Sequence, residues 1–466
     1  MGGAQIVWLR QDLRLADQRA FFMAAQAGPV IPVYVLDDET PRHRTMGGAS
    51  RWWLHHSLAA LADDLAAQGS RLVLRRGKAA DVLAGLAQER GAEAIHAIRH
   101  YEPWWRNAER ALKDALPAHV SFHRHDGNYL LPPGTVTSGS GGQYRIFTPF
   151  WRALMTHMPP PDILPAPKLD APESWPVSDL LADWGLLPTS PDWATGMRAA
   201  WECGEAAAQA QLDDFADRVG DYGEGRNLPS IDGSSRLSPH LHFGEISPGQ
   251  VWHRLAGIAG EGTQTFLREV VWRDYAANVI RQFPDYPERP FKPDFENFTW
   301  RDPASDPEAA ADLAAWQQGR TGYPIVDAGM RQLWATGWMH NRVRMIAASF
   351  LIKHLLIDWR HGERWFWDTL VDADYGNNGV NWQWVAGSGV DASMFVRIMA
   401  PLVQSPKFDA AGYIREWVPE LAGLGDSEIH DPDGRGLARS AYPGKRIDHR
   451  EARARALAAW GELKSG

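Results

Sequence analysis

Short runs of apolar and β-branched residues alternate with stretches of helical spacing over the first part of the chain. The runs are Ile6–Leu9, Val30–Leu36, Arg71–Arg75, Ala94–Ile98 and Val120–His123, and the helical stretches between them include Trp52–Ala67 and Ala79–Arg90. Strands that alternate with helices are typical of a parallel sheet joined by crossover helices. The pattern therefore predicts a doubly wound α/β domain over residues 1–132.

The rest of the chain shows helical periodicity almost throughout. Trp201–Val219 and most of the sequence after Thr263 have apolar residues at helical spacing, with short turns and no second strand-rich block. Ahead of them, nine prolines fall among the 34 residues from Met158 to Pro191, a density that stiffens a connecting segment. We expect an interdomain linker over 133–195 and an all-α domain over 196–466.

The composition fits a soluble globular protein and limits its chemistry. Hydrophobic residues make up 44% and charged residues 23% of the 466 residues. The single cysteine, Cys203, excludes a disulfide framework and a four-cysteine metal site within one chain. The sequence has no run of 18 apolar residues and no N-terminal signal segment. We expect a cytoplasmic monomer with no membrane partner and no metal.

The α/β pattern lacks the usual nucleotide-binding motifs. No G-x-G-x-x-G follows the first strand and no G-x-x-x-x-G-K occurs, so neither a dinucleotide-binding Rossmann site nor a P-loop is indicated. The net charge of −9 argues against a general nucleic-acid binder, although a local basic patch can override the sum. The 23 tryptophans exceed what core packing needs, because Leu and Ile fill space without an N–H group to satisfy.

Two stretches combine polar groups with a helix-like context. In "GSSRLSPHLHFGEIS" (Gly233–Ser247), hydroxyls and Arg236 precede a helical segment, an arrangement that binds anions; the alternative is a serine cap beside a solvated arginine. In "REVVWRDY" (Arg268–Tyr275), Glu269 and Trp272 share one helix face, where they could hydrogen-bond and stack a flat heterocycle. The alternative there is a boundary tryptophan with an exposed glutamate.

A third stretch, Gly337–Ile357, has helical spacing and a basic character. Asn341, Arg344 and Met345 fall on one face of the expected helix. Four basic residues and no acidic ones occur between positions 331 and 357, which predicts a positive strip suited to phosphate and a ring system: Arg331, Arg342, Arg344 and Lys353. His340 has no partner at metal-ligand spacing, so a structural histidine is favoured over a metal ligand.

The fourth stretch, "VDADYGNNGVNWQW" (Val371–Trp384), keeps neither strand nor helix period over its first ten positions. Asp372 and Asp374 could form a metal or acid–base site, or accept hydrogen bonds from an arginine, a ribose or ring N–H groups. If the chain becomes helical near Trp382, then Trp382 and Trp384 point about 200° apart and face different compartments. The alternative is a tryptophan-rich corner of the core.

Taken together, these stretches resemble the photolyase/cryptochrome family of blue-light flavoproteins. The most specific are "WLRQDLRLAD" (Trp8–Asp17), "GRTGYPIVDAGMRQLWATGWMHNR" (Gly319–Arg342) and "FWDTLVDADYGNNGVNWQW" (Phe366–Trp384). The resemblance implies an N-terminal α/β domain and a helical FAD-binding domain, in agreement with the periodicity. It also implies light-driven splitting of cyclobutane pyrimidine dimers in DNA by an electron from excited reduced FAD.

The resemblance carries roles onto individual residues. The positions that match FAD-binding residues are Tyr222, Ser234, Ser235, Arg236, Leu237, Ser238, Arg344, Asp372, Asp374 and Asn378, the last facing flavin N5. Trp382, Trp359 and Trp300 match the tryptophans that relay electrons to FAD. The positions that match the lesion pocket are Glu269, Trp272, Asn341, Arg342, Met345 and Trp384, and Arg226, Arg342 and Arg397 match phosphate contacts. Glu269, Asn341, Met345 and Asn378 are the implied catalytic residues.

Three alternatives within the resemblance are weighed by single positions. In the pattern of the (6-4) photolyases, two consecutive histidines stand where this chain has His340-Asn341. The difference disfavours the (6-4) reaction. Plant-type cryptochromes, the photoreceptor alternative, carry Asp at position 341 and lack the aromatics at 272 and 384. Trp104-Trp105 in "RHYEPWWRNAER" resembles the folate antenna site of the bacterial class III branch, where tryptophans stack on methenyltetrahydrofolate; the other interpretation is a pair of exposed interdomain tryptophans.

Overall fold

The computed structural model describes residues 3–437 and 441–465. The chain divides into two compact units. The first comprises 1–194, 201–219 and 235–284, and the second comprises 195–200, 220–234 and 285–466. This division differs from a boundary at 195/196, because two helical stretches after the linker group with the α/β residues.

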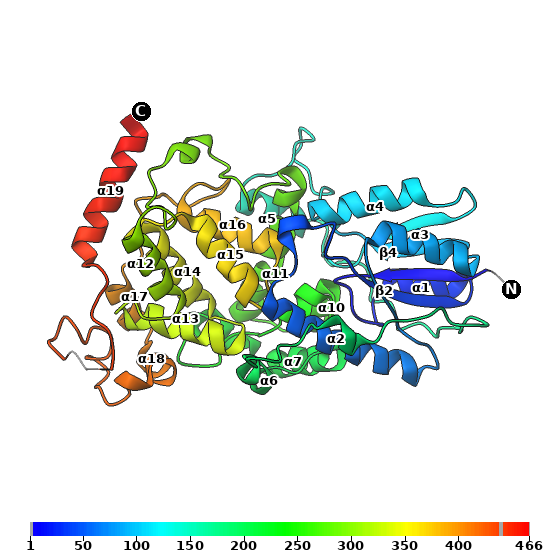
Figure 1. The fold of residues 1–466 in the computed structure, drawn as a ribbon, viewed down its shortest axis with the longest axis horizontal. Helices are drawn as coiled ribbons and strands as arrows, with labels where there is room; N and C mark the ends of the chain where they lie inside the picture. Colours follow the sequence, from blue (N-terminus) through cyan, green and yellow to red (C-terminus); the bar gives the residue numbers. More distant parts are fainter. Residues whose placement is uncertain (1–2, 438–440, 466) are drawn as a thin grey trace. The chain divides into compact units, whose positions relative to one another are not determined.

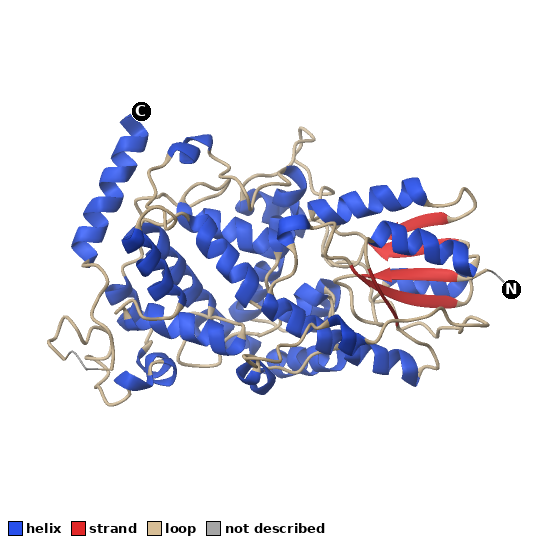
Figure 2. Cartoon of the chain, viewed as in Figure 1, coloured by secondary structure: helices blue, strands red, loops and turns tan. Residues whose placement is uncertain are grey.

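A five-stranded parallel sheet forms the centre of the first unit, drawn in red in Figure 2. Its strands are β1 (Gln5–Leu9), β2 (Val30–Leu36), β3 (Val73–Arg76), β4 (Ala94–Ile98) and β5 (Ser121–His125), in the order β3-β2-β1-β4-β5. β1, β2 and β4 are buried along their whole length, as expected for parallel strands covered on both faces. The doubly wound α/β fold predicted from the sequence is confirmed.

Helices complete the first unit. They are α1 (Arg19–Ala27), α2 (Gly48–Ala67), α3 (Ala79–Arg90), α4 (Pro103–Ala115), α5 (Phe147–Met155), α7 (Glu205–Arg218), α9 (Ser238–Phe243), α10 (Pro248–Leu255) and α11 (Glu261–Gln282). The proline-rich segment runs back along the α/β residues and does not span free space. Val30 N–H donates to the Asp170 carbonyl over 2.9 Å, and Asp17 N–H donates to the Leu164 carbonyl over 2.8 Å. The first four residues of the predicted helix Trp201–Val219 lie outside α7.

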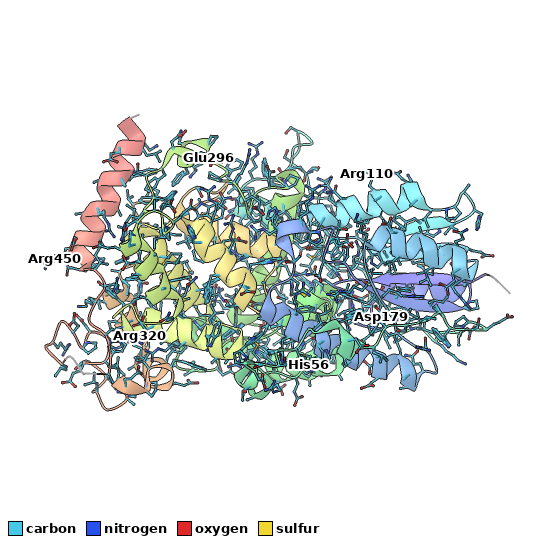
Figure 3. The ribbon with its side chains drawn as sticks, viewed as in Figure 1. His56, Arg110, Asp179, Glu296, Arg320 and Arg450 are labelled. Carbon is cyan, nitrogen blue, oxygen red and sulfur yellow. The ribbon has the colours of Figure 1, made fainter. Side chains whose placement is uncertain are left out.

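The second unit is helical. Its α-helices are α6 (Thr195–Ala200), α8 (Tyr222–Gly225), α12 (Pro307–Gln317), α13 (Pro324–Thr336), α14 (Asn341–Ser349), α15 (Trp359–Thr369), α16 (Tyr375–Ala386), α17 (Pro401–Lys407), α18 (Ala411–Trp417) and α19 (His449–Ser465). Figure 1 shows α12–α16 gathered around one core, and Figure 3 shows side chains filling the spaces between these ribbons. No helix in the described part of the chain is long and apolar enough to cross a membrane.

The predicted helix over Gly337–Ile357 is wrong at both ends. Gly337 has a φ of +68° and ends α13, so the new helix begins only at Asn341. After Ser349 the chain forms a wider turn, the π-helical segment η5 (Phe350–His354), in which Leu355 N–H donates to the Phe350 carbonyl over 3.0 Å. Apolar spacing alone does not distinguish this wider turn from an α-helix.

A buried carboxyl group on α11 fixes the end of the α/β segment. Asp274 is fully buried, and one of its oxygens accepts a hydrogen bond from Leu131 N–H over 3.3 Å. One turn later, Asn278 accepts from Gly134 N–H over 2.7 Å. Among the described residues the other Asp274 oxygen has no hydrogen-bond partner, and burial raises the pKa of Asp274 to about 7. The folded protein therefore holds a proton there that the unfolded chain releases near pH 4.

Replacing Asp274 by Asn tests this titration. Because the folded state binds the extra proton, the free energy of unfolding of the unmodified protein falls as pH rises between about 4 and about 7. We expect Asp274→Asn, which keeps an acceptor for Leu131, to show a smaller loss of Tm between about pH 5 and about pH 8. Asp217→Asn, at an exposed position on α7, is the control and should follow the unmodified protein. Parallel Tm curves for all three proteins would contradict the assignment.

Candidate functional site

A paired arginine and aspartate join α14 to the loop before α16. Arg344 Nη1 and Nη2 donate to Asp372 Oδ1 and Oδ2 over 3.1 and 2.9 Å. Arg344 Nε also donates to the Met339 carbonyl over 2.7 Å, which orients the guanidinium plane. Of the alternatives for Asp372, the structure supports the arginine partner over an acid–base pair with Asp374, whose carboxylate caps α16 by accepting from Asn377 N–H over 2.6 Å.

Asn378 occupies a defined orientation one turn into α16. Its Nδ2 donates both to the Glu363 carbonyl over 3.0 Å and to Glu363 Oε1 over 2.9 Å. Glu363 itself is fully buried on α15. Because both amide hydrogens of Asn378 are directed at Glu363, Oδ1 is the end of the amide left to accept a hydrogen bond from a ligand. No spacing in the sequence indicated Glu363, because it lies on a different helix.

Trp382 is enclosed by aromatic neighbours on α15 and α12. Its ring lies 5.0 Å from Phe366 and 6.3 Å from Trp316, edge to face in both cases. Gly362 makes this packing possible, since a Cβ atom there would lie 2.1 Å from Trp382 Cη2. The α-helix extends through Trp382 and Trp384, as the prediction of their divergent directions requires. Trp382 is buried, Trp384 is half-buried, and both pack against the same core cluster.

The other two tryptophans of the expected relay follow on connected segments. Trp359 is the first residue of α15 and is buried. Trp300 is half-buried, and its neighbour Arg301 pairs with Ile357 in an isolated parallel bridge, with Arg301 N–H donating to Leu356 over 2.8 Å. Burial therefore decreases from Trp382 and Trp359 to Trp300, the order that a relay from the interior toward solvent requires.

The expected phosphate-binding positions are divided between the two units, because the chain passes from the second unit to the first after Ser234. In the second unit, Tyr222 opens α8, and Gly225 contacts Gly233 so closely that a Cβ atom on Gly233 would lie 2.3 Å from the Gly225 carbonyl oxygen; Ser234 follows. In the first unit are the remaining positions, Ser235, Arg236, Leu237 and Ser238. Arg236 has a φ of +52° and lies 5.7 Å from the Trp201 ring. Helix α9 has only six residues, so an anion expected there would depend on hydroxyl and guanidinium groups more than on the helix N-terminus.

Glu269 and Trp272 lie on α11, and the structure adds Phe147 to them. Both predicted residues are half-buried and three positions apart. Phe147 on α5 stacks on Trp272 with ring centroids 3.5 Å apart and planes within 6°. Tyr275 O–H donates to the Arg145 carbonyl over 2.7 Å and holds that segment against α11. One face of Trp272 is therefore covered by protein, and a ligand can stack only on the other.

Phe147 was not found by sequence reasoning. It lies in the region read as linker, where no periodic pattern separates a functional phenylalanine from a packing one.

The predicted positive strip is not a continuous basic face. Arg331 pairs with Glu420 over 2.8 Å and Arg344 pairs with Asp372, while Lys353 is buried. Acidic partners distant in sequence thus neutralise two of the four positions. Arg342 contacts the Asn227 side chain and the Phe408 ring.

The remaining positions of the second unit that are expected to contact the lesion or DNA lie on α14, just after α8, and on the loop between α16 and α17. Asn341 is exposed at the first turn of α14, and Met345 one turn later is half-buried. Arg226 follows α8, with its guanidinium carbon 5.3 Å from the Tyr222 ring centroid. Arg397 is exposed on the loop between α16 and α17.

Trp104 and Trp105 differ in exposure. Trp105 is only 9% exposed and packs edge to face on Trp8 at 6.2 Å, as part of the α/β core. Trp104 precedes it on α4 and is half-buried. Trp105 is thus not one of two exposed interdomain tryptophans, and Trp104 is the member of the pair with accessible surface.

His340 has a structural role. Its Nδ1 accepts a hydrogen bond from Arg342 N–H over 3.2 Å at the start of α14, and burial lowers its pKa to about 4. This contact supports the structural interpretation of His340. Within residues 3–437 and 441–465, no group of three or more His, Cys, Asp or Glu side chains is arranged to hold a metal ion.

The polar groups of the second unit fit a flavin. An isoalloxazine ring presents alternating donors and acceptors along one edge, and a dinucleotide adds hydroxyl and phosphate groups. Asn378 offers an oriented amide oxygen, the Arg344–Asp372 pair offers both a donor and acceptors, and Tyr222 and Ser234 offer hydroxyls. This donor set is suited to FAD rather than to a metal ion.

Comparison with known families agrees with this geometry. Residues 5–170 match the model described as DNA photolyase, and residues 266–462 match the model described as the FAD binding domain of DNA photolyase. The chain belongs to the photolyase/cryptochrome family. It therefore carries the FAD-binding domain that the resemblance implied.

Individual relatives cover the chain almost completely. The sequence is 47% identical to a deoxyribodipyrimidine photo-lyase of Agrobacterium fabrum over 98% of each chain. It is 36% identical to cryptochrome-1 of Arabidopsis thaliana over 92% of this chain and 65% of the relative. The crystal structure of a bacterial class III photolyase from Agrobacterium tumefaciens superposes with a TM-score of 0.93 at 46% identity, covering 100% of this chain and 98% of that one.

The contact between Gly362 and Trp382 gives a direct test of the site's packing. In Gly362→Ala the new methyl group must displace both the Trp382 ring and Leu351, and we expect the free energy of unfolding in urea to fall by about 1–3 kcal/mol. Gly461→Ala is the matched control, because it is also a helix-interior glycine of the second unit but has no atom within 4 Å of the new Cβ. It should stabilise by about 0.5–1 kcal/mol through helix propensity. Equal effects of the two changes would show that Gly362 has no packing role.

Proposed function

We propose that this protein repairs cyclobutane pyrimidine dimers in DNA by light-driven electron transfer, as a class III photolyase. The observation that carries the proposal is the 47% identity to a deoxyribodipyrimidine photo-lyase over 98% of both chains. The superposition on a class III photolyase at a TM-score of 0.93 supports the branch. DNA that contains pyrimidine dimers is the partner of this reaction.

The side chains divide between holding the lesion and holding the cofactor. Trp272 and Trp384 supply apolar walls for the flipped-out dimer, and the face of Trp272 opposite Phe147 is the one that contacts it. Glu269 and Asn341 hydrogen-bond the base edges, Met345 packs beside them, and Arg226, Arg342 and Arg397 bind backbone phosphates. Bound FAD in its reduced form supplies the electron that opens the cyclobutane ring after light excitation.

Around the cofactor, Arg344, Asp372, Asp374 and Asn378 set the position and hydrogen bonding of the ring system. Asn378 presents its Oδ1 because both hydrogens of Nδ2 are directed at Glu363. A fixed acceptor favours the protonated state of a ring nitrogen next to it. Tyr222 and Ser234–Ser238 bind the phosphates. Trp382, Trp359 and Trp300 conduct electrons between the cofactor and the surface, from two buried rings to a half-buried one.

A repair assay tests the function. With reduced FAD and blue light, the purified protein should restore dimer-containing oligonucleotides, whereas a cryptochrome-type photoreceptor would bind FAD without restoring them. Trp382→Phe should abolish photoreduction of oxidised FAD but leave repair by chemically reduced protein unchanged. Trp417→Phe, a half-buried tryptophan outside the proposed relay, should behave like the unmodified protein. Absence of restoration with fully reduced FAD would refute the proposal.

The antenna is methenyltetrahydrofolate, stacked on Trp104. Trp104 is the better candidate because Trp105 is already packed against Trp8. We also propose, from the sequence, that the protein is cytoplasmic and monomeric.

Substitution of Trp104 separates the two tryptophans. Trp104→Ala should remove a near-UV folate absorption band while leaving the FAD spectrum intact, and Trp104→Phe should retain part of the band because a phenyl ring still stacks. Trp105→Ala would instead open a cavity in the core and lower the free energy of unfolding by about 3–5 kcal/mol. If Trp104→Ala leaves the absorption spectrum of folate-loaded protein unchanged, Trp104 does not bind the antenna.

A further inference from the structure

Lys353 is a buried lysine, and no acidic side chain among the described residues pairs with it. Its side chain lies in η5 and the residue is 2% exposed. In the described part of the chain its ammonium group makes one hydrogen bond, from Nζ to the Arg397 carbonyl oxygen over 2.8 Å, and lies 5.5 Å from the Phe395 ring centroid. Burying a charge without a counter-ion is costly, and an apolar side chain of similar length would fill the same space. The hydrogen bond to the Arg397 carbonyl is therefore the reason for a lysine at this position.

What Lys353 holds is the loop between α16 and α17. Phe395 is the anchor of this loop: it is 1% exposed, stacks on Trp460 at 5.3 Å and packs on Phe298 at 5.0 Å. On either side of it, Met394 is 72% and Val396 is 40% exposed.

A second bond to the segment α14–η5 follows the first. Met399 N–H donates to Ser349 Oγ over 3.2 Å, two residues after the Arg397 carbonyl that Lys353 binds. The loop thus has a buried anchor, two bonds to the helical segment beneath it, and an exposed surface that includes Arg397.

The titratable groups that the described residues place around Lys353 are arginines and neutral histidines. Arg397 on the loop lowers the pKa of Lys353, although less than burial does, and the two together bring it to about 7. His354 on η5 and His449 on α19 have pKa values lowered by burial, so both are neutral near pH 7. Arg455 on α19 donates to the His354 carbonyl over 2.7 Å. Of these groups, only Lys353 changes charge just above neutral pH.

We propose that Lys353 is a positioning residue for DNA binding: its ammonium group holds the backbone at Arg397, and loss of its charge weakens the complex with DNA. This inference rests on the proposed function, in which Arg397 contacts a phosphate. A charged donor binds the Arg397 carbonyl more strongly than a neutral amine does, so protonation fixes the point from which the guanidinium extends.

DNA binding and protonation of Lys353 are linked. A phosphate at Arg397 adds negative charge close to a half-protonated ammonium and raises the pKa of Lys353. The complex then holds more protons than the free protein between the two pKa values, so affinity falls as pH rises from about 7. The linkage is reciprocal: the factor by which bound DNA raises the proton affinity of Lys353 is the factor by which protonation of Lys353 raises the affinity for DNA.

The experiment measures Kd for a fluorescent dimer-containing oligonucleotide from about pH 6.5 to about pH 8.5 at constant ionic strength, with FAD-loaded protein. If DNA raises the pKa of Lys353 by one or more, the unmodified protein should bind about tenfold more weakly at the upper pH. Lys353→Met should bind more weakly at the lower pH and show no pH dependence. Lys353→Arg keeps the charge at all these pH values, and it should bind at the upper pH as the unmodified protein does at the lower.

The control is Lys292→Met. Lys292 also donates to a backbone carbonyl, that of Gly387 over 2.7 Å, but it is an exposed residue and should leave the pH profile unchanged. FAD absorbance and photoreduction of the variants verify that the fold is intact.

Two results overturn the inference. One is a Kd for DNA that depends on pH in Lys353→Met as it does in the unmodified protein, and the other is a Kd that does not depend on pH in the unmodified protein. If the protein shows no preference for dimer-containing over undamaged DNA at any pH, the proposed function fails instead.

Discussion

The bidentate contact between Arg344 and Asp372 is the interaction on which the arrangement of the second unit depends. It joins two segments that are otherwise separate in sequence, the start of α14 and the loop before α16. The helix α14 carries Asn341 and Met345, and α16 carries Asn378, Trp382 and Trp384. Because both helices are fixed to the same ion pair, groups assigned to the lesion and groups assigned to the cofactor keep one relative position. Electron transfer between two bound molecules depends on a constant relative position of the two molecules more than on any single reactive side chain.

Two buried polar side chains of the second unit, Asn378 and Lys353, each bond to a partner on another element. Asn378 on α16 is oriented by Glu363 on α15, and the Arg397 loop is held by Lys353 in η5. Burying such groups costs free energy, which the aromatic packing of Phe366, Trp316 and Trp382 offsets. The tryptophan excess therefore has two roles, since the same rings that stabilise the core also supply the proposed electron path.

The sequence predicted what depends on local spacing and missed what depends on contacts between distant segments. The strands of the sheet were found to within about two residues because apolar β-branched runs are a local signal. The opposite directions of Trp382 and Trp384 followed from helix geometry alone. In contrast, four basic residues without acidic neighbours suggested a positive strip, and the carboxylates that neutralise two of them, Asp372 and Glu420, come from elsewhere in the chain. Phe147 and Glu363 were missed for the same reason, whereas the wider turn of η5 was missed because apolar spacing alone does not distinguish it from an α-helix.

The neutralised strip changes how an acidic protein can bind DNA. With a net charge of −9 and with Arg331 and Arg344 already paired, long-range attraction to the phosphate backbone is weak. Under the proposed function the affinity comes from a few arginines at defined positions, of which Arg397 lies on an anchored loop beside exposed apolar side chains. Weak attraction to undamaged duplex and a rigid local contact both favour discrimination, because a distorted lesion gives up less stacking energy when it leaves the helix. If Arg397 contacts a DNA phosphate as proposed, the precision with which Lys353 holds the loop backbone contributes to the specificity for damage.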